Sequence, residues 1–128
     1  MAESVKVAVR VRPFNQREKD RGSKCVIDMV GKTTQITNPE TPNEKPREFS
    51  FDFSYWSHDE FHSDDDGVLC ADSPKYATQR MVFDDLGQGV LDNAVKGFNC
   101  SLFAYGQTGT CFHGFFGSGN ILCHGITS

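Results

Sequence analysis

The segment with the clearest chemical signature is a glycine-rich turn that directly follows the apolar run 100–105. A buried strand that ends in such a turn is where proteins build phosphate-binding loops, because successive backbone N–H groups face the phosphates. The turn is therefore a candidate phosphate-binding loop, and an ordinary surface loop is the alternative. Its residues are Gly106, Gln107, Thr108, Gly109 and Thr110.

The three residues after the turn lack the groups that such a loop needs. The phosphate-loop pattern continues with Gly-Lys-Ser or Gly-Lys-Thr, in which the lysine neutralises phosphate charge and the hydroxyl binds Mg²⁺. Here the corresponding residues are Cys111, Phe112 and His113. Phe112 supplies no cation, and Cys111 places a side chain where the backbone must approach phosphate most closely. The sequence therefore predicts no catalytic residue and no metal ligand at this turn.

Two clusters of potential metal ligands have simpler explanations. In a calcium loop aligned on Gly67, the first ligand would be His62 and the closing Glu would be Ser73, so a solvated acidic loop over 57–73 is favoured. The second cluster has none of the spacings found in zinc fingers and is expected to be a chance set in a tail. It consists of Cys111, His113, Cys123 and His124.

Composition limits the class of protein. A chain of 128 residues with 38% hydrophobic and 23% charged residues predicts one folded domain. A formal net charge of −4 disfavours nucleic acid as a partner, and no apolar run approaches the roughly 20 residues that span a bilayer. The five cysteines are an odd, scattered set, which favours reduced thiols. We expect a soluble, cytoplasmic protein with no membrane insertion.

Period-two patterns predict most of the strands. Val5 to Arg12 alternates valines with other residues, which indicates a strand with one apolar face, and Pro13 ends it. On such a strand, Arg10 and Arg12 would ordinarily lie on the solvated face. Aromatic residues alternate over 48–56 and predict a second strand. A hairpin is predicted from runs 25–29 and 33–37, followed by a proline-containing loop over 38–46.

One helix is predicted, from Pro74 to Gly97. Gly87 and Gly89 within it each cost about 1 kcal/mol relative to Ala, so packing of an apolar face must stabilise it. Residues 111–128 show neither period and are expected to be a tail without regular structure. The predicted apolar face of the helix consists of Tyr76, Phe83, Leu86, Val90 and Ala94.

Three segments resemble one protein family. The run from Val5 to Asn15 (Val-Lys-Val-Ala-Val-Arg-Val-Arg-Pro-Phe-Asn) is similar to the first strand of the kinesin motor domain. Gly97 to Gly109 is similar to the strand and the beginning of the phosphate loop of that domain, and Phe49 to His58 resembles the kinesin-3 class, which transports vesicles. The resemblance covers residues 4–110, roughly the first third of a motor domain.

The resemblance implies an α/β fold, namely an incomplete three-layer P-loop NTPase fold with a mainly β central sheet and one long helix. It implies that residues 1–110 are the N-terminal part of a kinesin-like motor domain and that 111–128 are unrelated to it. Arg10, Arg12 and Pro13 would flank the adenine of ATP, and Gly106 to Thr110 would approach its phosphates. The complete motor would use ATP and Mg²⁺ and bind microtubules, which places it on the cytoskeleton.

The resemblance stops abruptly between Thr110 and Cys111. We therefore hypothesise that residues 111–128 come from a frame shift, mis-splicing or a retained intron. Both nucleotide switches and the microtubule-facing helices of the family are missing, so this chain alone is expected to bind no nucleotide, to be inactive and to be marginally stable. The alternatives are a non-catalytic product that acts only by binding and some other nucleotide-binding protein.

Overall fold

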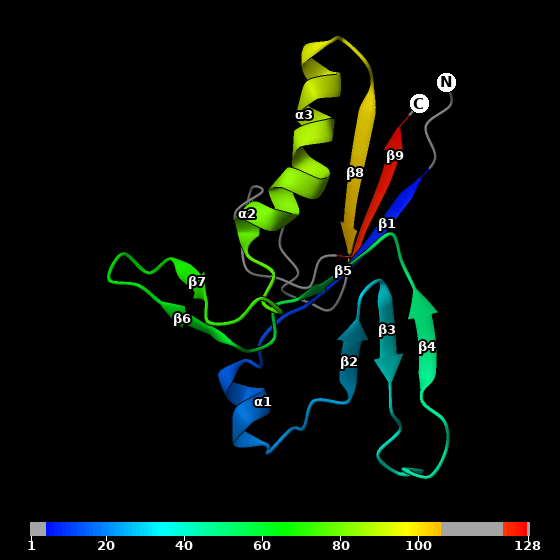
Figure 1. Ribbon diagram of the computed structural model, residues 1–128, viewed down its shortest axis with the longest axis vertical. Coiled ribbons are helices and arrows are strands. Elements are labelled where there is room, and N and C mark those ends of the chain that lie inside the picture. The colour runs from blue at the N-terminus through cyan, green and yellow to red at the C-terminus, as the bar shows by residue number, and fades with distance from the viewer. Residues whose placement is uncertain (1–4, 106–121, 128) are drawn as a thin grey trace.

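The computed structural model describes residues 5–105 and 122–127, and its strands form three small sheets (Figure 1). The strands are β1 (Lys6–Val11), β2 (Ile27–Val30), β3 (Thr33–Ile36), β4 (Arg47–Ser50), β5 (Phe53–Trp56), β6 (Phe61–Ser63), β7 (Leu69–Ala71), β8 (Cys100–Tyr105) and β9 (Leu122–Thr127). The helices are α1 (Gln16–Asp20), α2 (Gln79–Val82), the π-helical turn η1 (Phe83–Gly87) and α3 (Gln88–Val95).

The largest sheet has four strands in the order β5-β1-β9-β8. β1 pairs in parallel with β5 and antiparallel with β9, and β9 pairs antiparallel with β8. Strands β2, β3 and β4 form a separate antiparallel sheet, and β6 pairs with β7 alone. Strand β1, which carries Arg10 and leads directly into Arg12 and Pro13, therefore lies inside its sheet.

Both faces of β1 are covered, so the expectation of one apolar face is wrong. On one face Ala8 is 2% exposed and packs in a cluster with Tyr55 and Val82. On the other face Val11 packs with Met29 and Trp56. Successive residues of a strand point to opposite faces. When both faces of the strand are covered, the side chains that the alternation predicted to be solvated are buried as well.

The aromatic run 48–56 forms two strands in different sheets, not the single strand predicted. The break lies at Asp52, whose N–H donates to the Val7 carbonyl (3.0 Å) and whose Oδ2 accepts from the Val7 N–H (2.7 Å). These two bonds turn the chain out of the β2-β3-β4 sheet and into the β1 sheet. The predicted hairpin is confirmed as β2 and β3, with Gly31 at φ +59° in its turn.

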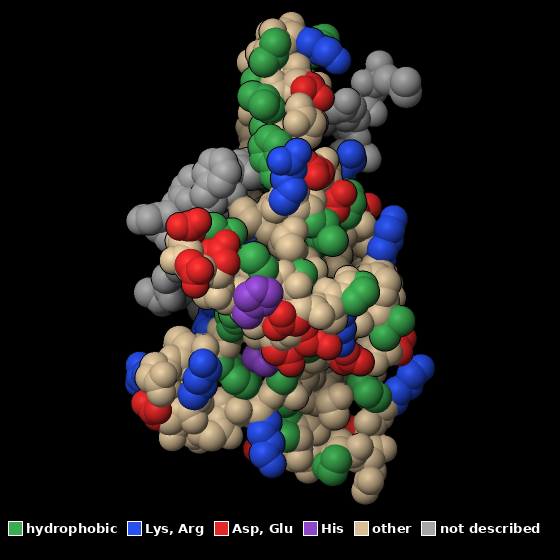
Figure 2. All heavy atoms as spheres, turned by 60° about the vertical axis from the view of Figure 1, so that its left-hand side comes forward, with side chains coloured by type: hydrophobic (Ala, Val, Ile, Leu, Met, Phe, Trp, Pro, Cys, Tyr) green, Lys and Arg blue, Asp and Glu red, His purple; other side chains and the backbone are tan. Residues whose placement is uncertain are grey.

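The acidic stretch within 57–73 contains a short hairpin, where the sequence predicted only a loop. Asp64 Oδ1 accepts from the N–H groups of Asp66 (3.0 Å) and Val68 (2.7 Å), and this arrangement shapes the turn between β6 and β7. Each strand has three residues, which is too few to show a period-two pattern. Figure 2 shows acidic side chains gathered on this face of the molecule.

The helical segment begins later than predicted. Thr78 is the N-cap, since its hydroxyl accepts from the Met81 N–H (3.2 Å). The residues after Pro74 instead run beside β5, where the Ala77 N–H donates to the Trp56 carbonyl (2.7 Å). This placement buries Tyr76 and Ala77, so tertiary packing overrides the helix-start signal of Ser73-Pro74.

The helix ends where the sequence predicted, at Gly97. This residue adopts φ +82°, and the N–H groups of Gly97 and Phe98 donate to the carbonyls of Ala94 and Asn93, which is the Schellman pattern. The apolar face is only partly buried: Phe83, Leu86 and Val90 are half-buried, but Ala94 is exposed. Leu91 and Val95 of α3 are exposed as well.

The tail expected to lack structure contains β9, so that expectation is wrong for residues 122–127. The strand was missed because its partners, β1 and β8, are remote in sequence. The phosphate-loop candidates 106–110 lie outside the described residues. Within the described part of the chain, no helix combines the length and the apolar character needed to cross a bilayer.

Two glycine substitutions, one within α3 and one just after its end, test the left-handed C-terminal cap at Gly97. Replacing Gly97 by Ala should lower the free energy of unfolding by about 1 kcal/mol, because an L side chain is strained at φ +82°. Gly89→Ala, at a helical position with open space around the added Cβ, should raise it by about 0.5–1 kcal/mol. Urea unfolding measures both. Equal stabilisation by the two substitutions would rule out the left-handed cap.

Candidate functional site

Of the three predicted site residues that the structure describes, Arg10 is buried, whereas Arg12 and Pro13 are half-buried. The Arg10 side chain leaves β1 on the face that carries Ala8, and the residue is 8% exposed. Nε donates to Ser57 Oγ (2.9 Å), Nη1 to Gln79 Oε1 (2.6 Å) and Nη2 to the Ala77 carbonyl (3.5 Å). The Ser57 hydroxyl also donates to the Ala77 carbonyl (2.7 Å). One guanidinium thus joins β1, the residue after β5 and the first turn of α2.

Arg12 lies just past the end of β1 and binds a carboxylate with both of its terminal nitrogens. Nη1 and Nη2 each lie 2.7 Å from one oxygen of Glu18, and Nη1 also donates to the Pro13 carbonyl (2.8 Å). Arginine suits this contact because its planar fork matches the two carboxylate oxygens. The two arginines that the sequence placed on one solvated face therefore have different environments, and only Arg12 is partly exposed.

Glu18 connects this ion pair to a helix cap. Asn15 Oδ1 accepts from the Glu18 N–H (2.9 Å), and Glu18 Oε2 accepts from the Asn15 N–H (2.8 Å), which is a capping box for α1. The hydrogen bond from Arg12, with that from the Asn15 N–H, lowers the pKa of Glu18 to about 2. Sequence reasoning missed Glu18, although Asn15-x-x-Glu18 is a recognisable N-terminal helix signal.

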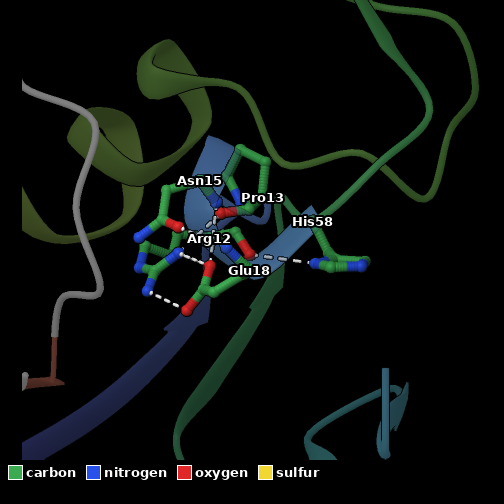
Figure 3. A network of polar contacts seen from close by, with 5 residues as sticks. All are labelled: Arg12, Pro13, Asn15, Glu18 and His58. Carbon is green, nitrogen blue, oxygen red and sulfur yellow. Dashed lines mark hydrogen bonds and ion pairs between the residues drawn. The ribbon is translucent and has the colours of Figure 1, made fainter. Parts of the chain in front are cut away.

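His58 holds the other side of the same loop (Figure 3). Its Nδ1 lies 3.0 Å from the Arg12 carbonyl oxygen, which can only accept, so the proton of this hydrogen bond is on Nδ1. The ring packs edge-on against Phe14, with centroids 4.6 Å apart, and against Trp56 at 5.6 Å. Arg12 is therefore held at two places, its side chain by Glu18 and its backbone carbonyl by His58.

The sheet brings the carboxyl ends of β1 and β8 to one edge. Leu122 of β9 is paired with Val9 on one side and with Tyr105 on the other. Val9 and Tyr105 are thus at the same level, about 10 Å apart across two strand spacings. Figure 1 shows β1, β8 and β9 meeting at this edge. Arg12 and Pro13 follow one strand there, and the glycine-rich turn follows the other.

The alternative metal clusters do not assemble within the described ranges. His62 Nδ1 and Asp72 Oδ1 form a 2.5 Å pair between exposed side chains. Across residues 5–105, no three His, Cys, Asp or Glu side chains are grouped as metal ligands would be. Of the other candidate set, Cys111 and His113 lie outside the described residues, and Cys123 and His124 belong to β9.

Comparison with known proteins decides the family. The model of the kinesin motor domain family matches residues 10–111. The chain belongs to the kinesin motor domain family. The match includes Arg10, Arg12 and Pro13 and all of β8, and it ends one residue after the glycine-rich turn. The resemblance noted in the sequence is therefore confirmed.

Relatives of this kinesin chain are much longer than it is. The kinesin-like protein KIF28 of Mus musculus is 52% identical over 111 residues, which are 85% of this chain and 11% of the relative. KIF1A of Rattus norvegicus is 52% identical over 106 residues, 83% of this chain and 6% of the relative. A solved structure of KIF14 with ADP in complex with a microtubule superposes with a TM-score of 0.68 at 38% identity. It matches 86% of this chain and 27% of that one, so the fold is an incomplete kinesin motor fold.

Substituting Arg10 tests its structural role. Arg10→Lys should lower the free energy of unfolding by about 2–3 kcal/mol, because one ammonium cannot replace the fork that reaches Ser57, Gln79 and Ala77. The control is Arg80→Lys. The Arg80 side chain is 83% exposed and forms an i,i+4 ion pair with Asp84. We expect this substitution to change the free energy of unfolding by no more than about 0.5 kcal/mol. Chemical unfolding separates the two. An equally small loss of unfolding free energy in both variants would contradict the structural role of the buried Arg10 hydrogen bonds.

The Glu18 contacts predict an acid-sensitive contribution to stability. The carboxyl pKa falls from 4.5 in an unperturbed chain to about 2 in the fold, so the stabilisation is complete above pH 4.5 and is lost as the pH drops towards 2. Wild type should therefore lose more stability over that interval than Glu18→Gln. Asp28, whose pKa is lowered by Lys75, is present in both proteins and cancels. If the curves of unfolding free energy against pH were parallel for wild type and Glu18→Gln, Glu18 would not be the source of the acid-sensitive stabilisation.

Proposed function

We propose that this chain is the N-terminal part of a kinesin-like motor whose complete form hydrolyses ATP and transports vesicles along microtubules. The family match over residues 10–111 supports the motor class. The similarity to a KIF14 structure solved with ADP and a microtubule supports nucleotide and tubulin as partners of the complete protein. The segment from Phe49 to His58 supports the kinesin-3 class, and with it a cytoplasmic protein on the cytoskeleton.

We assign the adenine side of the nucleotide site to Arg12 and Pro13, with Arg10 beneath them. Arg12 and Pro13 are half-buried at the carboxyl edge of the sheet, where ligands of open α/β sheets bind. Glu18 holds the Arg12 side chain, His58 holds the Arg12 carbonyl, and the Arg10 link keeps β1 in place. Gly106 to Thr110 would approach the phosphates from the end of β8. The observation that carries this assignment is the shared edge of β1 and β8.

The residues present do not fit the phosphates and Mg²⁺. Positions 111–113 are Cys, Phe and His, which provide neither the cation nor the metal hydroxyl of a phosphate loop. Phosphoryl transfer depends on positioning and on electrostatic stabilisation around the metal and the γ-phosphate. We therefore infer that the chain by itself hydrolyses no ATP. The same three residues favour the second candidate function, a non-catalytic product that acts only by binding.

A titration and a chimera test both parts of this proposal. Calorimetry of the chain with Mg-ATP should give a dissociation constant weaker than about 100 μM, which is near −5.5 kcal/mol. The matched chimera replaces residues after Thr110 with the remainder of a kinesin-3 motor domain. It should bind ATP and hydrolyse it faster with microtubules, because the missing cradle and switches are restored.

A third variant tests whether restoring the phosphate loop alone, without the rest of the motor domain, is enough for activity. Cys111→Gly, Phe112→Lys and His113→Ser together restore the loop pattern but should still give no ATPase, because the remaining motor elements are absent. Tight Mg-ATP binding by the unaltered chain would overturn the inactive assignment. A folded but inactive chimera would overturn the motor assignment and the roles of Arg12 and Pro13.

A further inference from the structure

Strand β9 occupies a special place in the largest sheet. β1 and β8 run parallel to one another but do not pair, because β9 lies between them and is antiparallel to both. Residues 122–125 pair with β1 through Lys6 to Val9, and residues 122–127 pair with all of β8. Within the described ranges, β9 alone makes β8 part of the sheet (Figure 1).

Removing β9 would open a slot one strand wide. The inner edge of β1 and that of β8 would each present a row of unpaired N–H and C=O groups. Such edges are templates for pairing with other chains, and leaving them open favours aggregation. β1 would keep β5 as a partner. β8 would keep no strand partner among the described residues, and only side-chain packing would remain, through Leu102 against the Ala8 cluster and through α3, including the contact from Cys100 Sγ to the Val90 carbonyl (3.5 Å).

We propose that the slot between β1 and β8 is a strand-docking site and that residues 122–127 of the same chain are its occupant. These residues lie outside the family match, which ends at residue 111, so the docking is a property of this chain. The consequence is a motor fragment that closes its own sheet and holds the ends of β1 and β8 at one level.

The sequence of the segment suits an interior strand. Leu-Cys-His-Gly-Ile-Thr contains no proline and none of the four residues Asp, Glu, Lys and Arg. An interior strand must offer every N–H to a neighbour, which proline cannot do, and charged side chains are typical of edges. The β-branched Ile126 and Thr127 also favour extended backbone. Gly125 is the one residue that weakens the strand.

Disulfide trapping tests the occupant and its register. Ala8 is the register partner of Cys123, and directly opposed residues of antiparallel strands have Cα atoms about 4.5–5.5 Å apart, within disulfide range. We would make Ala8→Cys in a chain that keeps Cys123 and has its other four cysteines replaced by serine, and oxidise it with glutathione disulfide, which is reduced to two glutathione thiols. The control, Val9→Cys, places the new thiol on the opposite face of β1, with Leu122 as its register partner.

The expected result is a disulfide within one chain for Ala8→Cys, formed at least several-fold faster than for Val9→Cys. Mass spectrometry detects it as the loss of two hydrogens and a cross-linked peptide pair. Equal rates for the two variants would overturn the proposal, because register would then not matter. A cross-link found only between two chains would also overturn it, since the segment would then fill the slot of a second copy.

Hydrogen exchange provides a second measurement on the full chain. His124 is the register partner of Val7 on β1 and of Phe103 on β8. His124→Pro removes an N–H from the strand and should reduce protection of β1 and β8 at least tenfold relative to His124→Thr, which keeps the N–H and the extended propensity. Equal protection of β1 and β8 in the two variants would show that residues 122–127 do not occupy the slot.

Discussion

The buried guanidinium of Arg10 is the constraint on which the rest of the arrangement depends. A cation taken out of water must find acceptors, and those of Arg10 include the Ser57 hydroxyl, the Gln79 amide oxygen and the Ala77 carbonyl. They come from elements that are remote from β1 in sequence. The hydrogen bonds of the Arg10 guanidinium therefore fix β1 against the residue after β5 and against the start of α2. This constraint is additional to the apolar contacts of the core.

The geometry of the candidate site depends on that fixed strand. Arg12 and Pro13 leave the sheet where β1 ends, and Glu18 holds the Arg12 side chain while His58 holds the Arg12 carbonyl (Figure 3). The Glu18 carboxylate serves the ion pair and the α1 cap together, which links a short helix to the site. The residues that make these contacts all lie within the kinesin match over residues 10–111.

An incomplete fold leaves surfaces that a complete one would cover. The chain matches only 27% of the KIF14 structure, and the exposed apolar residues of α3, with Phe103 of β8, remain in contact with solvent. β9 compensates on one side of β8 by pairing along its whole length. The expectation of a marginally stable fragment thus rests on the exposed α3 face. The backbone groups of β1 and β8 that face each other contribute less to it, because β9 pairs with both strands.

Local signals in the sequence determined the strand from Val5, the β2-β3 hairpin, the end of the helix at Gly97 and the family, because each depends on residues close together in the chain. The missing lysine and hydroxyl at positions 112 and 113 were equally visible. Only the tertiary structure decided that the aromatic run breaks at Asp52 and that Thr78 caps the helix, since both depend on pairing with distant strands. It also separated Arg10 from Arg12. Alternation gives the two arginines the same pattern, and burial depends on the groups that pack over each one.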